Sequence, residues 1–391
     1  MRSHARELCD RHGYPAELAE VLEEFVELAL THLGDIYSIV LSPSISTGDF
    51  LWRRDGAEVR LLSDIDGFIY LQGSLKGSAQ DLAGYVAAVQ RLSEEISEEI
   101  AGPMFHIDLS VSSMQTLDQL PQTYQFVETG CAGFVLYGEP VLDRFPTKFD
   151  PRASRQAFLL NLWKPLRHAF LSSDPDPTAA AQAAARLILD IPILAASESG
   201  ECIAGHRERV RWFLAERPTL LGRDDEIRAA VMAAKTAREE PPGSVAELAP
   251  LLHIAIPRVV SLLDQRGEPA SDFGAAIVER LAQWLPPRTP RRFLGECASV
   301  LRRPTNPVAD LRWLHHRKEA SGGAALLALY HYVAQLAEAG VADPPEEIRT
   351  LLRNFARREC SNETGPAFVR SACEVYQQGL WELYPALHKV D

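Results

Sequence analysis

Segments with strand character are confined to the first 150 of the chain's 391 residues, and no other sequence feature constrains the fold as strongly. The clearest is 104–113, where apolar and polar residues alternate, as is typical of a strand buried on one face. The other segments with strand character are 36–41, 61–71 and 133–140. Apolar residues at helical spacing predict helices over 14–33 and 79–100. This order predicts an α+β domain over residues 1–150.

Beyond residue 150 the apolar spacing is helical as far as the C-terminus, and proline and glycine separate the helical segments. We therefore predict a large all-α region after the sheet. Breaks near 241 and near 286 could each divide it, and we divide it at the second, Pro286-Pro287. The expected parts are a helical domain over 151–285, which completes a cleft with the first domain, and a C-terminal helical domain over 286–391.

The overall charge and the cysteine pattern restrict the function classes. The formal net charge is −13, which argues against extended nucleic-acid binding. No apolar run approaches the roughly 18–20 residues that cross a membrane, and the first residues lack a signal-peptide core. The six cysteines are scattered without a Cys-x-x-Cys pair, which fits reduced thiols and gives no zinc site. We expect a cytoplasmic protein without membrane contact.

The segment 61–71 opens with two carboxylates, Asp64 and Asp66. Side chains at i and i+2 of a strand lie on one face, about 7 Å apart along the axis. Two such carboxylates need a cation, a proton or water between them. A divalent metal that carries a polyphosphate meets this need, and a solvent-exposed strand end is the alternative. Asp108, on the polar face of the 104–113 strand, is placed to become a third carboxylate of the group.

A loop of small residues follows the strand at 36–41, with the sequence Ser42-Pro43-Ser44-Ile45-Ser46-Thr47-Gly48. Backbone N–H groups and hydroxyls in such a loop can hold a phosphate, although an ordinary turn has the same composition. Asp55-Gly56 then predicts a β-hairpin within 49–62. Farther along, the cations of 203–209 surround one glutamate; we expect a solvated helix start there, with Arg207 as a candidate anion contact.

The order of these features resembles the nucleotidyltransferase superfamily, which includes polymerase beta, the aminoglycoside nucleotidyltransferases and the minimal nucleotidyltransferases. Its pattern is a Gly-Ser loop, an Asp-x-Asp strand and a third Asp on a later strand. Ser63-Asp64-Ile65-Asp66 and Asp108 are similar to the last two elements, and Leu136-Tyr137-Gly138 is similar to the Leu-Tyr-Gly element of many bacterial members. The resemblance covers about residues 36–150 and implies a mixed sheet with flanking helices.

The resemblance also implies a chemistry. Two Mg²⁺ ions would be held by Asp64, Asp66 and Asp108, and a nucleoside triphosphate would be the co-substrate. Ser44, Ser46, Thr47 and Gly48 would hold its β- and γ-phosphates, and Lys164 would reach the triphosphate. Asp108 would be the general base for a hydroxyl of a small acceptor, such as a sugar, an antibiotic or a biosynthetic intermediate. The product would be a nucleoside monophosphate ester, with release of pyrophosphate.

One departure from the family pattern keeps other functions open. Pro43 stands where the family has glycine, and proline offers no N–H and a fixed φ. Phosphate binding would then survive with altered geometry, or the activity would be reduced. One alternative is nucleotidylation of a protein, with the helical region as the docking surface. The other is a degenerate nucleotidyltransferase fold that serves as a binding or regulatory module.

Overall fold

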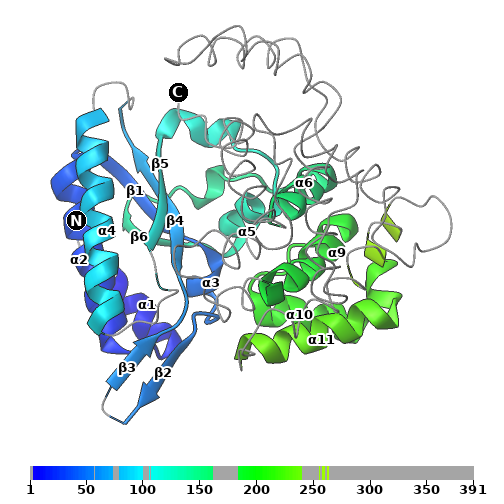
Figure 1. Ribbon diagram of the computed structural model, residues 1–391. Coiled ribbons are helices and arrows are strands. Elements are labelled where there is room, and N and C mark those ends of the chain that lie inside the picture. Colours follow the sequence, from blue (N-terminus) through cyan, green and yellow to red (C-terminus); the bar gives the residue numbers. More distant parts are fainter. Residues whose placement is uncertain are drawn as a thin grey trace, which may run out of the picture. The chain divides into compact units, whose positions relative to one another are not determined.

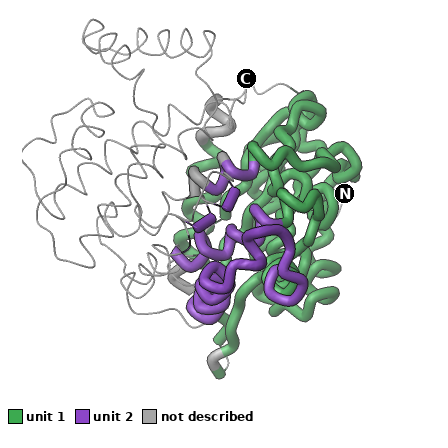
Figure 2. Tube along the Cα trace, turned by 90° about the vertical axis from the view of Figure 1, so that its right-hand side faces the viewer, with its two compact units in different colours: residues 1–153, 196–212, 389–391 green, residues 154–195, 213–388 purple. Residues whose placement is uncertain are grey.

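The computed structural model describes residues 3–56, 58–73, 79–99, 105, 107–161 and 184–239, together with 255, 258–259 and 262–263. Lys164 and the predicted C-terminal helical domain over 286–391 lie outside these residues. The chain divides into two compact units, which Figure 2 colours separately. Unit 1 comprises residues 1–153, 196–212 and 389–391, and unit 2 comprises residues 154–195 and 213–388. Within the described part of the chain, no helix combines the length and the apolar character needed to span a membrane.

A four-stranded mixed sheet forms the centre of unit 1 (Figure 1). Its strands are β1 (Ile36–Leu41), β4 (Ile65–Leu71), β5 (Ile107–Ser113) and β6 (Phe134–Gly138), in the spatial order β5-β4-β1-β6. β4 and β5 are parallel, whereas β1 is antiparallel to both of its neighbours. The α+β fold predicted for the N-terminal part is thereby confirmed, and the alternation expected in 104–113 appears in β5 as alternating buried and more exposed positions.

Helices α2 (Ala16–Leu33) and α4 (Ala79–Glu99) cover one face of the sheet (Figure 1), close to the predicted spans 14–33 and 79–100. The sequence did not predict the helix before them, α1 (Ala5–His12). The side chains of Leu18, Leu22 and Phe25 recur at helical spacing in α2 and are fully buried. They join the sheet residues Ile65 and Ile69 in one hydrophobic core.

A smaller core lies on the opposite face of the sheet. Phe68 and Tyr70 of β4 pack there with Leu117 and Phe145. The covering elements are η2 (Met114–Gln119), α5 (Tyr124–Ala132) and η3 (Leu142–Arg144). Since residues i and i+2 of a strand share a face, Asp66 points to this side of the sheet, in line with Phe68.

The predicted strand over 61–71 is wrong at its start. The predicted hairpin is present as β2 (Trp52–Asp55) and β3 (Glu58–Leu61), and β4 begins only at Ile65. Between β3 and β4 the amides of Leu62 and Ser63 both donate to the carbonyl of Leu51, at 2.9 and 3.2 Å. These bonds bend the chain toward Leu51, so that Asp64 directly precedes β4 instead of lying within it.

The described residues after 150 are helical or irregular, and none of them forms a strand. Residues 184–189 are helical, and the further helices include α6 (Pro151–Asn161), α9 (Ile191–Ser199), α10 (His206–Glu216) and α11 (Asp225–Glu239), with the short η4 (Leu221–Arg223) before α11. Asp224 caps α11, because its carboxylate accepts from the amides of Glu226 and Ile227 at 3.1 and 3.0 Å. An all-α character is thus present in the described residues of this region.

Candidate functional site

Two of the three predicted aspartates are side by side in the sheet. Asp66 of β4 pairs with Asp108 of β5 in the parallel register, and neighbouring strands lie about 4.8 Å apart. The next pair back, Ile65 and Ile107, is buried on the opposite face. Asp66 is half-buried and Asp108 is exposed. The fold therefore brings together two carboxylates that are far apart in the sequence.

Asp64 lies immediately before this pair. It is half-buried, while its neighbours Ser63 and Ile65 are both buried. The hydroxyl of Ser63 accepts a hydrogen bond from the amide of Leu51 at 3.0 Å. Asp64 thus lies just before the start of β4, on the bend that separates β3 from β4.

The donor set of these three aspartates suits a magnesium ion, because Mg²⁺ prefers carboxylate oxygens. As the side chains stand, however, the described residues contain no cluster of three or more His, Cys, Asp or Glu that could hold a metal ion. The backbone brings Asp66 and Asp108 into register, but a shared ion would require all three carboxylates to turn toward one point. The three residues therefore fit Mg²⁺ by their chemistry, but they do not form a metal-binding cluster in this structure.

The small-residue loop lies next to Asp66. The amide of Ser42 donates to the carbonyl of Asp66 at 2.9 Å, which extends the β1–β4 pairing by one bond. The loop itself is a short helix, α3 (Pro43–Ser46), followed by Thr47 at its C-terminal end. Pro43 stands in the first turn, where no intrahelical N–H is required and where its fixed φ suits a helix. Proline is therefore compatible with this backbone.

Two of the predicted phosphate ligands already have partners in the chain. Ser46 Oγ donates to the carbonyl of Ala132. Thr47 Oγ1 donates to the carbonyl of Pro43 at 2.6 Å and lies 3.2 Å from the carboxylate of Asp49. To bind a phosphate, these hydroxyls would have to exchange those bonds for new ones.

The remaining predicted ligands differ from these two. The hydroxyl of Ser44 is buried without a hydrogen-bond partner, and so is the hydroxyl of Ser42, which the sequence reading did not single out. Gly48 has φ +84, and a Cβ there would lie 3.3 Å from Nδ1 of His12 at the end of α1. Ser42 and Ser44 are therefore the loop hydroxyls with unused hydrogen-bonding capacity.

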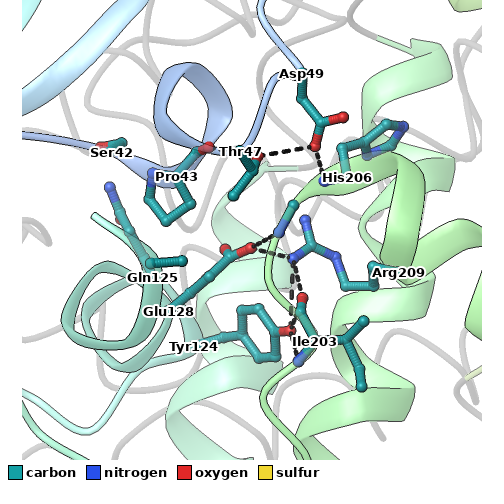
Figure 3. Close-up of polar contacts among 12 residues, drawn as sticks. Ser42, Pro43, Thr47, Asp49, Tyr124, Gln125, Glu128, Ile203, His206 and Arg209 are labelled. Atoms are coloured by element: carbon teal, nitrogen blue, oxygen red, sulfur yellow. Dashed lines mark hydrogen bonds and ion pairs between the residues drawn. The ribbon is translucent and has the colours of Figure 1, made fainter. Parts of the chain in front are cut away.

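Sequence reasoning missed Asp49, which ties the loop to a distant helix (Figure 3). Its side chain is buried and accepts from the amides of His206 and Arg207, the latter at 3.3 Å. A carboxylate in this position caps the N-terminus of α10 and interacts favourably with its dipole. Arg207, the predicted anion contact, lies 3.8 Å from Asp49 through its Nε. The anion that Arg207 contacts is therefore the carboxylate of Asp49 in the same chain.

A buried ion pair lies beside this cap (Figure 3). Arg209 Nη1 of α10 donates to Glu128 Oε1 of α5 at 2.6 Å, and Glu128 also accepts from the amide of Gly205 at 2.9 Å. The guanidinium of Arg209 lies 5.1 Å from the ring centre of Tyr124, whose hydroxyl donates to the carbonyl of Ile203 at 2.8 Å. We refer to Tyr124, Glu128, Ile203, Gly205 and Arg209 as the anchor network.

The anchor network corrects the expectation of a solvated helix start at Arg209, whereas Arg207 and Glu208 are exposed as expected. Arg209 is 5% exposed and Glu128 is 8% exposed. Burial acts to lower the pKa of Arg209, but the carboxylate of Glu128 and the hydroxyl of Tyr124 outweigh this effect and raise it. Arg209 is therefore a permanent buried cation whose charge is balanced by Glu128. A glycine directly before an amphipathic helix was the one signal in the sequence that pointed to a close contact here.

None of the protein-family models, curated proteins or solved structures compared with this chain matches it significantly.

Proposed function

We propose that this protein is a magnesium-dependent nucleotidyltransferase that moves a nucleoside monophosphate from a nucleoside triphosphate to a hydroxyl of a small acceptor. The observation that carries the proposal is the in-register pair of Asp66 and Asp108, with the small-residue loop joined to Asp66 through the amide of Ser42. This arrangement supports the proposal because carboxylates are ligands that Mg²⁺ prefers, and loops of small residues are a common way to hold a phosphate.

In this proposal Asp64, Asp66 and Asp108 hold two Mg²⁺ ions. When bound, the ions would supply charge stabilisation for the triphosphate and lower the pKa of the attacking hydroxyl. Asp108 is the most exposed of the three and accepts the proton of the acceptor hydroxyl as the general base. Ser44 offers its unused hydroxyl to a phosphate, together with Gly48. The resemblance also implies triphosphate binding by Lys164, which lies outside the described residues.

The reaction is assigned to the cytoplasm. Cys9, Cys131 and Cys202 are free thiols in the part of the chain that the structure describes, and free thiols are typical of proteins in reducing compartments. The negative net charge of −13 supports a small acceptor over an extended nucleic acid, because a nucleic acid would be repelled.

A binding or regulatory module is the second candidate. The observation that favours it is the engagement of Ser46 and Thr47 with backbone carbonyls, which removes two hydroxyls from a phosphate site. Such a module would bind a nucleotide, or another ligand, without turnover. Calorimetry with each nucleoside triphosphate separates the two functions, since binding that requires Mg²⁺ supports the transferase and binding that ignores Mg²⁺ supports the module.

The direct test is turnover by aspartate variants. The purified full chain is incubated with Mg²⁺, each labelled nucleoside triphosphate and a panel of hydroxylated acceptors, and pyrophosphate release is followed. We expect Asp66→Asn and Asp108→Asn each to lower the rate by more than about 100-fold, since loss of even an outer partner of a metal ligand can have an effect of 10–100-fold. Asp143→Asn, at an exposed position in η3, is the matched control and should leave the rate unchanged.

The proposal is wrong if Asp66→Asn and Asp108→Asn both turn over nucleotide at the rate of the unmodified chain. Label recovered in protein, and not in a small product, would instead support nucleotidylation of a protein by the same carboxylates.

A further inference from the structure

The hydroxyl of Ser42 is buried beside the candidate site and has no use in the fold. Ser42 is 6% exposed, and its Oγ has no hydrogen-bond partner among the described residues. A buried hydroxyl without a partner is destabilising, because it has given up its hydrogen bonds to water. Buried polar groups in proteins almost always have a partner, so an exception of this kind calls for a functional explanation.

Capping of α3 does not explain this serine. Ser42 occupies the N-cap position, directly before Pro43 (Figure 3), where a serine side chain commonly accepts from an amide of the first turn. Its side chain accepts no such bond. The backbone of Ser42 is engaged, since its carbonyl accepts from the amide of Ile45 at 3.3 Å. The local fold of the loop therefore uses the backbone of Ser42 and not its hydroxyl.

The register of the sheet places Ser42 beside the carboxylate pair. In the antiparallel pairing of β1 with β4, Leu41 is opposite Gly67, so the next residue, Ser42, is opposite Asp66. The amide of Ser42 donates to the carbonyl of Asp66 at 2.9 Å, and Asp66 is in turn opposite Asp108 of β5. The side chains of directly opposite residues share a face, with Cβ atoms about 4.5–5.5 Å apart in an antiparallel pair. Ser42, Asp66 and Asp108 therefore form one row across the sheet, which we call the carboxylate row.

We propose that Ser42 is a positioning residue for the carboxylate of Asp66, an inference that rests on the proposed function. Its hydroxyl donates a hydrogen bond to one carboxylate oxygen of Asp66 when that carboxylate turns toward an ion shared with Asp108. The other oxygen of Asp66 is left for the ion. Only side chains rotate in this step, because the backbone pairing of Ser42 with Asp66 is already in place. Outer partners of this kind orient the ligands of a metal and strengthen its binding.

The burial of Ser42 favours a partner within the chain. A ligand from solvent would first have to displace the atoms that cover Oγ of Ser42. The half-buried carboxylate of Asp66 is on the neighbouring strand and reaches this hydroxyl by rotation alone. A hydrogen bond to an ionised carboxylate is about twice as strong as one between neutral groups. Formation of this bond would also end the unpaired burial of the hydroxyl.

The test measures metal binding directly and needs no turnover. The full chain is titrated with Mn²⁺, which takes oxygen ligands as Mg²⁺ does, and free Mn²⁺ is followed by electron paramagnetic resonance. Asp66→Asn identifies the ions that belong to the carboxylate row, because only these are lost. We expect Ser42→Ala to weaken the binding of these ions by about 10-fold or more, as for other outer partners of metal ligands. Ser42→Thr, which keeps the hydroxyl, should restore the binding.

Ser38 provides a matched control. It lies four residues before Ser42, on the same face of the same chain segment, and its hydroxyl is also buried without a partner. Ser38 is opposite Tyr70, about 13 Å along the strand from the carboxylate row. Ser38→Ala should leave Mn²⁺ binding unchanged. Neither alanine variant should lower the unfolding temperature of the metal-free chain, since each removes an unpaired buried hydroxyl, so a loss of Mn²⁺ binding will not reflect a loss of folding.

The possible results separate this inference from the proposed function. If Asp66→Asn loses Mn²⁺ and Ser42→Ala binds it as the unmodified chain does, the positioning role is wrong and the proposed function stands. Weaker binding of a nucleoside triphosphate by Ser42→Ala, with unchanged binding of Mn²⁺, would also overturn the positioning role and assign the hydroxyl to a phosphate. If the unmodified chain binds no more Mn²⁺ than Asp66→Asn, the ion site is absent, and the proposed function and the inference are both wrong.

Discussion

Removing the charge of Glu128 is the sharpest test of how the anchor network holds unit 1 together. In Glu128→Gln the side chain keeps its size and can still accept a hydrogen bond from the amide of Gly205. It loses the negative charge that lies 2.6 Å from Nη1 of Arg209. The guanidinium then remains in its buried site, with the carbonyl of Ile203 at 3.1 Å and the ring of Tyr124 as its neighbours. Neither of these carries a compensating charge.

The magnitude follows from the burial of the pair. Breaking a buried ion pair by removing one partner destabilises a protein by about 3–5 kcal/mol, because an uncompensated charge is left behind. We expect the lower end, ~3 kcal/mol, since glutamine keeps one of the two hydrogen bonds. At about 1.4 kcal/mol for each factor of ten, this corresponds to more than about a 100-fold change in a local opening equilibrium.

Hydrogen exchange followed by mass spectrometry measures this opening directly. In Glu128→Gln the amides of α5 and of the start of α10 should lose protection by about two orders of magnitude, since the substitution lowers the free energy of local opening by ~3 kcal/mol relative to the unmodified chain. The matched control is Glu7→Gln in α1, where Glu7 and Arg11 form a pair at 2.8 Å with side chains 55% and 53% exposed. This exposed pair should be worth only about 0.3–0.5 kcal/mol. Equal protection in the two variants would refute the role of the buried pair.

Three further predictions concern other parts of the structure. Gly205→Ala should destabilise unit 1 by at least about 1–2 kcal/mol in denaturant unfolding, because Gly205 has φ +82 and a Cβ there would lie 2.8 Å from Oδ2 of Asp49; unchanged stability would contradict the close approach. Burial acts to raise the pKa of Asp224, but the hydrogen bond from Arg258 helps to lower it overall. The ionised carboxylate of Asp224 therefore stabilises the fold above its usual pKa near 3.8, and this stabilisation is lost as the pH falls through the lowered pKa of the folded state. Asp224→Asn should thus destabilise the protein at pH 7 and little in strong acid, as pH-dependent unfolding would measure. Burial also raises the pKa of Cys9 to about 12, so iodoacetamide should alkylate it on the order of 100-fold more slowly than Cys131, and comparable rates in a peptide map would contradict its burial.

The parts of the fold that the sequence predicts well are those set by near neighbours. The spans of β1, α2 and α4 follow from side-chain spacing over at most four residues, and the structure agrees with each within two residues at either end. The break before β4 was missed because it depends on a residue that is distant in the sequence. It depends on hydrogen bonds from Leu62 and Ser63 to Leu51, and no pattern within 61–71 records an acceptor that lies on the other side of a hairpin.

In the candidate site, too, the sequence predicts local features but not the contacts between distant residues. The sequence supplied three aspartates in the right order, but the pairing of Asp66 with Asp108 depends on the register of two strands separated by the whole of α4. Glu128 and Arg209 are farther apart still, and each occupies a helix in which charged residues are usually solvated. Their burial depends on each other, since neither charge could be buried alone. The local sequence pattern of either helix therefore cannot predict that Glu128 and Arg209 are buried together.

Pro43 illustrates how one residue bears differently on fold and on function. In the fold it is favourable, because the first turn of α3 needs no N–H from it. In a phosphate site it is unfavourable, because each amide that is absent leaves one fewer donor for an anion. The hydroxyls of Ser42 and Ser44 are buried and unpaired on the same turn, so they are donors that could replace the missing amide in part. Burial of a polar group without a partner is itself destabilising. A ligand that accepted hydrogen bonds from these two hydroxyls would relieve that destabilisation, which is why the loop, despite its proline, remains the place where a phosphate is expected.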